Sequence, residues 1–188
     1  MIKFTVPIPP SVNKAYGMKV EYRGGRAFPQ RYLTSESRNY KKYVMLLIKR
    51  IMKENNIEYL IKDKTSFVNL KMTVYIDKKR KDVDNMFKLL FDSIVDSGLI
   101  PDDDIIIYNI EDIFIDKLKP RLEIEMSISD KIGIFKNEKM MNKFKLENCS
   151  LCKKSNYKRQ CSIFKKALEN RIEPDINLKN NICYKKNP

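Results

Sequence analysis

The 188-residue sequence contains no histidine. This absence removes the most common general base, the Cys-His and Ser-His-Asp nucleophile systems, and every metal site that needs an imidazole ligand. Any chemistry must therefore come from carboxylates, lysines, cysteines or a bound metal ion. The sequence also lacks a run of about 18 apolar residues, the length that a membrane span needs, and it opens on a strand-like segment rather than a secretory leader. These absences predict a cytoplasmic protein with no membrane partner.

Positive charge is in excess and unevenly distributed along the chain. The sequence has 38 Lys and Arg residues against 24 Asp and Glu residues, a net charge of +14, which suggests a polyanionic partner such as nucleic acid. Residues 131–188 have a net charge of +10, whereas residues 1–130 have only +4. All four cysteines lie in the same basic tail. We therefore predict a first domain at 1–130 and a basic, cysteine-rich element at 131–188.

Hydrophobic periodicity predicts alternating strands and helices in residues 1–130. Prolines after the first strand forbid its continuation as a central strand, and the glycine-containing, basic segment that follows suits a mobile hairpin or flap, or a plain surface loop. The predicted elements are strands at 2–8, 67–76, 105–115 and 121–128, helices at 35–55 and 84–97, and the hairpin or loop at 11–31.

Carboxylates gather at both ends of the second predicted helix. Asp82 and Asp84 are two residues apart in an extended connection, so their side chains can point the same way, and Lys88 follows Asp84 by one helical turn. Three more aspartates follow the helix at 102–104. Converging carboxylates raise one another's pKa unless a cation compensates, and Mg²⁺ or Mn²⁺ prefers such oxygen ligands. An ion held there can generate hydroxide for phosphodiester hydrolysis without a histidine.

The same residues also have a purely structural interpretation. Asp82 or Asp84 can cap the helix, and Asp84 can form an exposed ion pair with Lys88. The aspartates at 102–104 can be ordinary turn residues. Spacing alone does not decide between a metal site and these structural roles.

Two motifs resemble the RusA family of Holliday junction resolvases. The run KDVDNMFK at 81–88, followed by the Asp-Asp pair at 102–103, is similar to the family's Asp-x-Asp-Asn-x-x-Lys motif and the acidic pair beyond it. The run PIPPSVNK at 7–14 resembles the family's N-terminal Pro-Pro-Ser-x-Asn loop. Together the resemblance covers residues 1–128, and it does not include the cysteine-rich tail.

The resemblance implies an α+β domain whose mixed β-sheet packs against helices. It also implies a homodimer that cuts four-way DNA junctions by paired symmetric cleavage with Mg²⁺ or Mn²⁺, in DNA recombination and repair in bacteria or their phages. Carried over residue by residue, Asp82, Asp84 and Asp103 match the catalytic, metal-binding carboxylates, and Lys88 matches the essential lysine. A two-fold dimer suits the approximate two-fold symmetry of a four-way junction.

Basic and amide side chains near these motifs are candidate phosphate ligands. Such contacts position DNA without reading its bases, so we expect binding to weaken steeply with salt. The candidates are Asn13, Lys14, Lys78, Lys79, Arg80 and Lys81.

The four cysteines suggest a second metal site. Cys149 and Cys152 form a Cys-x-x-Cys pair, a good start for a tetrahedral Zn²⁺ site, although the spacings to Cys161 and Cys183 are not those of a common finger. An Fe-S cluster and four unligated thiols are the alternatives. Because the tail has few large apolar groups, we expect a bound Zn²⁺ ion to organise it.

A short helix is also predicted between Cys161 and Cys183, from apolar residues that include Ile163, Ala167 and Ile172. Around it, the basic side chains of the tail are expected to contact phosphates. The cysteine-rich element is therefore predicted to be an auxiliary DNA-binding element.

Two other functions compete with junction resolution. The first is a metal-dependent nuclease that acts on other branched DNA, such as flaps or forks, because junction selectivity depends on the dimer. The second is a non-catalytic basic DNA-binding protein. The complete set of carboxylates and Lys88 favours an enzyme over the second alternative.

Overall fold

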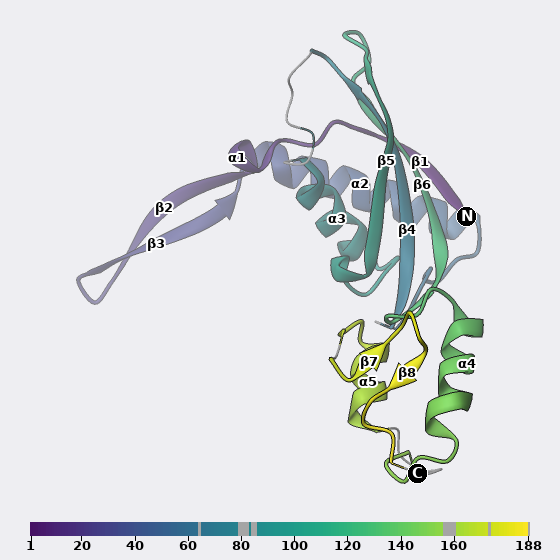
Figure 1. Cartoon of the computed structure of the whole chain (residues 1–188). Coiled ribbons are helices and arrows are strands. Elements are labelled where there is room, and N and C mark those ends of the chain that lie inside the picture. The colour runs from purple at the N-terminus through teal and green to yellow at the C-terminus, as the bar shows by residue number, and fades with distance from the viewer. Residues whose placement is uncertain (64, 79–82, 84–85, 156–160, 173, 188) are drawn as a thin grey trace. The chain divides into compact units, whose positions relative to one another are not determined.

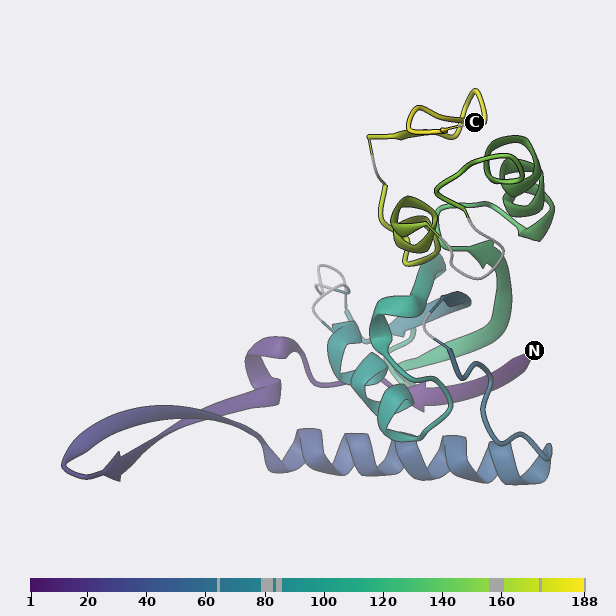
Figure 2. The same cartoon turned by 90° about the horizontal axis from the view of Figure 1, so that it is seen from below.

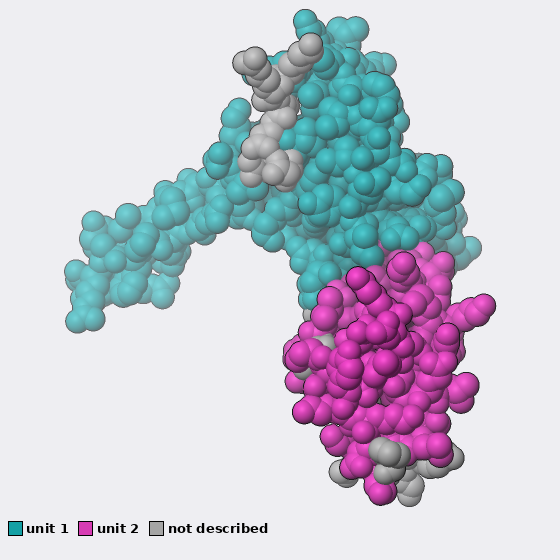
Figure 3. All heavy atoms as spheres, in the orientation of Figure 1, with its two compact units in different colours: residues 1–62, 69–127 teal, residues 63–68, 128–188 magenta. Residues whose placement is uncertain are grey.

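The computed structural model describes residues 1–63, 65–78, 83, 86–155, 161–172 and 174–187. The chain divides into two compact units, shown in different colours in Figure 3. Unit 1 comprises residues 1–62 and 69–127, and unit 2 comprises residues 63–68 and 128–188. Within the described residues, no helix has both the length and the apolar character that a membrane span requires.

A mixed β-sheet forms the centre of unit 1 (Figure 1). Its strand order is β1-β6-β4-β5, and β1 runs antiparallel to β6, with Phe4 opposite Ile124. The amide of Asp116 donates to the carbonyl of Ile76 over 2.8 Å, which aligns the ends of β4 and β5. The chain passes through α3 between these two neighbours, the crossover that parallel strands need. The bounds are β1 Ile2–Pro7, β4 Ser66–Ile76, β5 Ile106–Ile115, β6 Arg121–Ile132 and α3 Phe87–Asp96.

One face of this sheet is apolar and is covered by α2 (Ser35–Glu54) together with α3 (Figure 2). Alternate residues of β4 are buried, as the predicted period of two requires, and Leu70 and Val74 have no exposed surface. The helices contribute residues at the three-and-four spacing, such as Val44 and Ile48 of α2. The predicted α+β class, with a mixed sheet packed against helices, is confirmed.

The two predicted helices begin and end close to their expected residues. The hydroxyl of Thr34 accepts from the amide of Ser37 and caps α2. After α3, Gly98 has a φ of +83°, the left-handed conformation that ends a helix. The first residues predicted for the second helix, 84 and 85, lie outside the described residues.

The segment predicted as a hairpin or a loop is a hairpin. A short helix, α1 (Val12–Ala15), leads into β2 (Tyr16–Arg23) and β3 (Arg26–Leu33), which form a separate two-stranded sheet. The two residues between the strands, Gly24 and Gly25, both have positive φ, as a tight two-residue hairpin turn requires. We call residues 16–33 the β2–β3 arm.

Unit 2 has its own hydrophobic core. The rings of Phe135, Phe144 and Phe164 contact one another, with centroids 5.4–6.4 Å apart, and Ile134, Ala167 and Ile176 complete the core. The expectation that the tail is too poor in apolar groups to form a core is therefore wrong. Around this core lie α4 Glu138–Cys149, α5 Ser162–Leu168, β7 Ile176–Asn177 and β8 Ile182–Cys183.

The short helix predicted in the tail is α5, which contains Ile163 and Ala167. Ile172 was wrongly included in it, because this residue follows the helix and is 80% exposed. Asn170 has a positive φ two residues after α5 ends, so the backbone has already left the helical conformation.

Gly133 is the position in unit 2 where a side chain is least tolerable. Its φ is +53°, and a Cβ atom there would lie 2.1 Å from the carbonyl oxygen of Ala167. We expect Gly133→Ala to lower the free energy of unfolding by about 2–4 kcal/mol, since backbone strain and overlap both contribute. Urea unfolding followed by circular dichroism measures the loss.

Gly98→Ala is the matched control for this variant. Gly98 also has a positive φ, but a Cβ atom there meets nothing within 4 Å. We expect this control to lose only about 1 kcal/mol, the cost of the backbone strain alone. Equal losses for the two variants would show that the close approach to Ala167 does not constrain unit 2.

Candidate active site

The start of α3 contains the first part of the acidic constellation. Asp82, Asp84 and the cations Lys79, Arg80 and Lys81 lie outside the described residues. Val83, the residue between the two aspartates, is described, and its carbonyl accepts from the amide of Met86 over 3.2 Å. This bond places Val83 directly before α3.

Lys88 and Asp103 come together next to this point. Lys88 lies in the first turn of α3, and Asp103 begins the short 3-10 helix η2 (Asp103–Ile105). The Nζ atom of Lys88 is 3.7 Å from Oδ2 of Asp103 and 3.2 Å from Oδ1 of Asp92. Both Lys88 and Asp103 remain partly open to solvent, with 58% and 38% of their side chains exposed, so a substrate can reach them.

Buried apolar side chains hold α3 and the 102–104 segment in place, so that Lys88 and Asp103 stay close together. Leu90 and Ile94 turn the opposite side of α3 into the core, and Leu99 and Ile105 are buried on either side of the 102–104 segment. Ser93 adds a hydrogen bond from its hydroxyl to the carbonyl of Leu89. The functional side chains are thus held by buried neighbours on the same elements.

The charge state of Lys88 follows from its neighbours. The hydrogen bond to Asp92 raises the pKa of Lys88 above its ordinary value, and the charge of Asp103 and the hydroxyl of Tyr16 raise it further. Lys88 is therefore a fixed cation at neutral pH. A protonated lysine cannot act as a general base, but it can stabilise negative charge that develops on a phosphate.

Two of these neighbours were missed by sequence reasoning. Asp92 follows Lys88 by four residues, so its helical spacing could have identified it. Tyr16 is the first residue of the β2–β3 arm, and no local pattern links it to α3. Only the folded chain reveals that the arm begins close to Lys88.

The remaining described candidates are at the surface. Asn13 and Lys14 are exposed in α1, which contacts α3. Lys78 is exposed two residues after β4 ends. All three side chains are accessible to a large polyanion.

Among the described residues, no group of three or more Cys, Asp or Glu residues is arranged to hold a metal ion. Two of the three carboxylates predicted to bind Mg²⁺ lie outside the described residues. The third, Asp103, offers the hard oxygen donors that Mg²⁺ prefers and is accessible, so its chemistry fits such an ion.

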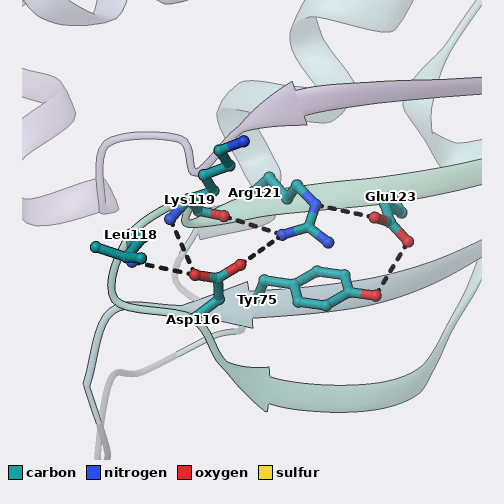
Figure 4. Close-up of polar contacts among 6 residues, drawn as sticks. All are labelled: Tyr75, Asp116, Leu118, Lys119, Arg121 and Glu123. Atoms are coloured by element: carbon teal, nitrogen blue, oxygen red, sulfur yellow. Dashed lines mark hydrogen bonds and ion pairs between the residues drawn. The ribbon is translucent and has the colours of Figure 1, made fainter.

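The sheet carries a second polar cluster, around Arg121 (Figure 4). The guanidinium bonds to Asp116 and Glu123 over 2.9 Å each and stacks on Tyr75, 3.5 Å from its ring centre. Tyr75 in turn donates to Glu123 over 3.1 Å. The amide of Lys119 donates to Asp116 and holds the pKa of this carboxyl below its ordinary value. Because these groups satisfy one another and pin the turn between β5 and β6, the cluster is structural.

A hollow of about 320 Å³ lies on the same sheet, between β1, β6, β4 and β5. Its carboxylates are balanced by cations, since Lys3 pairs with Glu125, Lys71 pairs with Glu111 over 2.9 Å, and Arg121 pairs with Glu123. This hollow is therefore a weaker candidate for metal or phosphate chemistry than the Lys88 region.

The four cysteines of unit 2 are free thiols held by its tertiary structure. Cys149 is buried in the core of unit 2, and Cys161 and Cys183 pack against that core. The amide of Phe164 donates to the sulfur of Cys161, and the amide of Asn187 donates to the sulfur of Cys152, both over 3.4 Å. Burial raises the pKa of Cys149 to about 11, whereas the hydrogen bond from Asn187 lowers the pKa of Cys152.

Comparison with known proteins assigns the first part of the chain to a family. The sequence model of the family described as Endodeoxyribonuclease RusA matches residues 7–127. No curated protein matches the chain significantly. The matched region contains the motifs at 7–14, 81–88 and 102–103, and it includes α3 with Lys88 and η2 with Asp103. Because the match spans more than half of the 188 residues, the chain belongs to the RusA family of endodeoxyribonucleases.

Proposed function

We propose that this protein resolves four-way DNA junctions by paired symmetric cleavage, using Mg²⁺ or Mn²⁺. The RusA family consists of Holliday junction endonucleases that depend on a metal ion. The observation that carries the proposal is the approach of Lys88 to Asp103 within the region that matches the family. A cation and a carboxylate from separate elements meet there at an accessible surface.

The carboxylates of Asp82, Asp84 and Asp103 are the proposed metal ligands. When bound, a divalent ion would supply hydroxide at neutral pH and stabilise charge on the phosphodiester. Asp103 is held at the start of η2 by the buried side chain of Ile105. It therefore needs little ordering when the ion and the substrate arrive.

Lys88 is the proposed stabiliser of the reacting phosphate. Its ion pairs with Asp92 and Asp103 restrict the ammonium group to one region of the surface. Because these pairs also keep it protonated, its positive charge is present before the reaction starts. Charge that is fixed in advance costs no reorganisation during the reaction.

The proposed assembly is a homodimer. A four-way junction has approximate two-fold symmetry, so a two-fold dimer presents one site to each of two opposed strands. Asn13, Lys14 and the basic run that begins at Lys78 would contact phosphates around each site. A nuclease selective for flaps or forks is the rival function, since it would use the same site with a different assembly.

The site assignment predicts that Asp103→Asn slows cleavage of a four-way junction by on the order of 100-fold, because a ligand and its charge are lost. Asp82→Asn and Asp84→Asn are expected to do the same. Single-turnover cleavage of end-labelled junctions with Mg²⁺ measures the rates, and EDTA should abolish cleavage by the wild type.

Asp104→Asn is the control for these variants. Asp104 neighbours Asp103 in the same 3-10 helix, and its replacement by Asn removes the same charge. Its side chain is exposed and has no proposed role. It should cut at nearly the wild-type rate. If Asp103→Asn cut as fast as Asp104→Asn, the assignment of Asp103 would be wrong.

The charge of Lys88 gives a separate prediction. Since its pKa is raised above the ordinary lysine value, Lys88 stays protonated at pH 9, and deprotonation of Lys88 should cause no fall in rate between pH 6 and 9. Lys88→Arg, which keeps the charge, should retain more activity than Lys88→Gln at every pH. If the cleavage rate of the wild type fell below pH 9 and that of Lys88→Arg did not, Lys88 would not be a fixed cation.

We also propose that unit 2 is an auxiliary DNA-binding element that binds Zn²⁺ through Cys149, Cys152, Cys161 and Cys183. Three of these residues meet at one core, and the fourth belongs to the same Cys-x-x-Cys turn. The amide hydrogen bond from Asn187 to the sulfur of Cys152 lowers the pKa of this thiol and so favours its thiolate form, which is the metal ligand. In this structure the four sulfurs are not arranged to hold a metal ion. The proposal therefore requires them to move closer together when Zn²⁺ binds.

Zinc should therefore copurify with the protein at about one ion per chain, the stoichiometry of a four-cysteine site. Cys152→Ser should lose this zinc and lower the unfolding temperature of unit 2. The nearby Ser150→Ala should retain the zinc and unfold at the wild-type temperature. Elemental analysis and thermal unfolding measure these effects. Absence of zinc, with the same fold before and after chelation, would overturn the zinc proposal, and iron in its place would indicate a cluster.

A further inference from the structure

The β2–β3 arm has an unusual combination of charge and exposed apolar surface. The arm, residues 16–33, contains four Lys and Arg residues and a single acidic residue, Glu21. Figures 1 and 2 both show the arm extending away from the helices and the sheet of unit 1. Three apolar side chains of β2 are nevertheless open to solvent, with Met18 68%, Val20 55% and Tyr22 76% exposed.

The pairing of the two strands sorts these residues onto two faces. Residues opposite each other in an antiparallel pair share a face, and successive residues alternate. Met18, Val20 and Tyr22 lie opposite Arg31, Pro29 and Ala27. We call this set the apolar face of the arm. Arg31 is the one cation in it, and it stacks on Tyr16, 3.8 Å from the ring centre.

The opposite face of the arm holds its remaining charged and amide side chains together with the rings of Phe28 and Tyr32, and its polar groups bond to one another. Glu21 pairs with Lys19 over 2.6 Å and with Arg23 over 3.1 Å, and Gln30 donates to it over 2.8 Å. These bonds lie between neighbouring side chains of one face, as the register requires. The apolar face has no comparable network.

The root of the arm is fixed beside the candidate active site. The amide of Thr34 donates to the carbonyl of Ala15 over 3.0 Å, and its hydroxyl donates to the carbonyl of Lys14 over 3.2 Å. These bonds hold the two ends of the arm together at the start of α2. The short helix α1, which ends directly before the arm, contacts α3, the helix that contains Lys88. The arm therefore extends from the place where the proposed reaction occurs.

We propose that the apolar face of the β2–β3 arm inserts against unpaired bases at the branch point of the DNA, next to the strand that the Lys88 site cuts. This inference rests on the proposed function. A two-stranded ribbon fits a DNA groove, and Met and Pro side chains act as wedges between base steps. Tyr22 offers a ring on which a base can stack. The arm would thereby contribute to selectivity for branched DNA.

The charge of the arm favours DNA over a second protein chain as its occupant. The cores of protein interfaces are depleted in charged residues other than arginine, whereas the arm has four cations and only one acid. The cations can hold phosphates on either side while the apolar side chains contact bases. A protein partner would leave most of this charge uncompensated.

Binding of DNA to the full-length protein in EDTA tests the arm without any cleavage. The variant carries Met18→Ser and Tyr22→Ser, and the control carries Leu118→Ser, a 91% exposed apolar residue outside the arm. The probes are a four-way junction with 2-aminopurine at the branch point and a linear duplex of the same length. We expect the arm variant to bind the junction at least about tenfold more weakly, since stacking on one or more bases is lost.

The same variant should bind the linear duplex as the wild type does, and it should give a smaller change in 2-aminopurine fluorescence. Equal weakening for junction and duplex would overturn the inference, as would unchanged binding of the junction. If the variant sedimented as a smaller species than the wild type, the apolar face would belong to an interface between copies of the chain. Circular dichroism and thermal unfolding establish that the variant is folded.

The nuclease proposal and the arm inference can fail separately, because the first predicts cleavage and the second predicts binding. If the wild type bound the junction through the arm but did not cut it with Mg²⁺, the arm inference would stand and the nuclease proposal would fall. If the wild type cut the junction and the arm variant bound and cut it equally well, only the arm inference would fall.

Discussion

The packing of α3 against the apolar face of the sheet is the constraint on which the candidate site depends. Leu90 and Ile94 have no exposed surface, so the helix cannot rotate without exposing them, at a cost of about 1.5–3 kcal/mol for each side chain. This orientation turns Lys88 outward, and the crossover from β4 to β5 returns the chain so that Asp103 lies beside it. A charged pair at the surface is thus positioned by apolar contacts beneath it.

Sequence reasoning predicted the parts of the fold that have strong hydrophobic periodicity. The helix at 35–54 and the buried face of β4 follow from spacing alone, and so does the end of α3 at Gly98. The core of unit 2 was missed because its phenylalanines are far apart in the sequence and few in number. The interaction of Tyr16 with Lys88 was missed for the same reason, since it joins residues of different elements. Long-range contacts leave no periodic signal in a single sequence.

The two units combine different sources of stability and different proposed roles. Unit 1 has a sheet covered by two helices and contains nearly all of the region that matches the family. Unit 2 is built around three phenylalanine rings and four free thiols, and it has most of the net positive charge. Together with the arm, its charge would extend the DNA-contacting surface beyond the nuclease core. In this view the nuclease core performs the metal-dependent chemistry, and unit 2 and the arm add DNA contacts.

The central claim is that the Lys88 region cuts four-way junctions symmetrically. Mapping the cleaved bonds at nucleotide resolution, with each of the four strands labelled in turn, tests it most directly. The account predicts nicks at equivalent positions in two opposed strands with Mg²⁺, and no comparable cleavage of flaps, three-way junctions or linear duplex. Cleavage of a single strand, or equally fast cleavage of a flap, would contradict it.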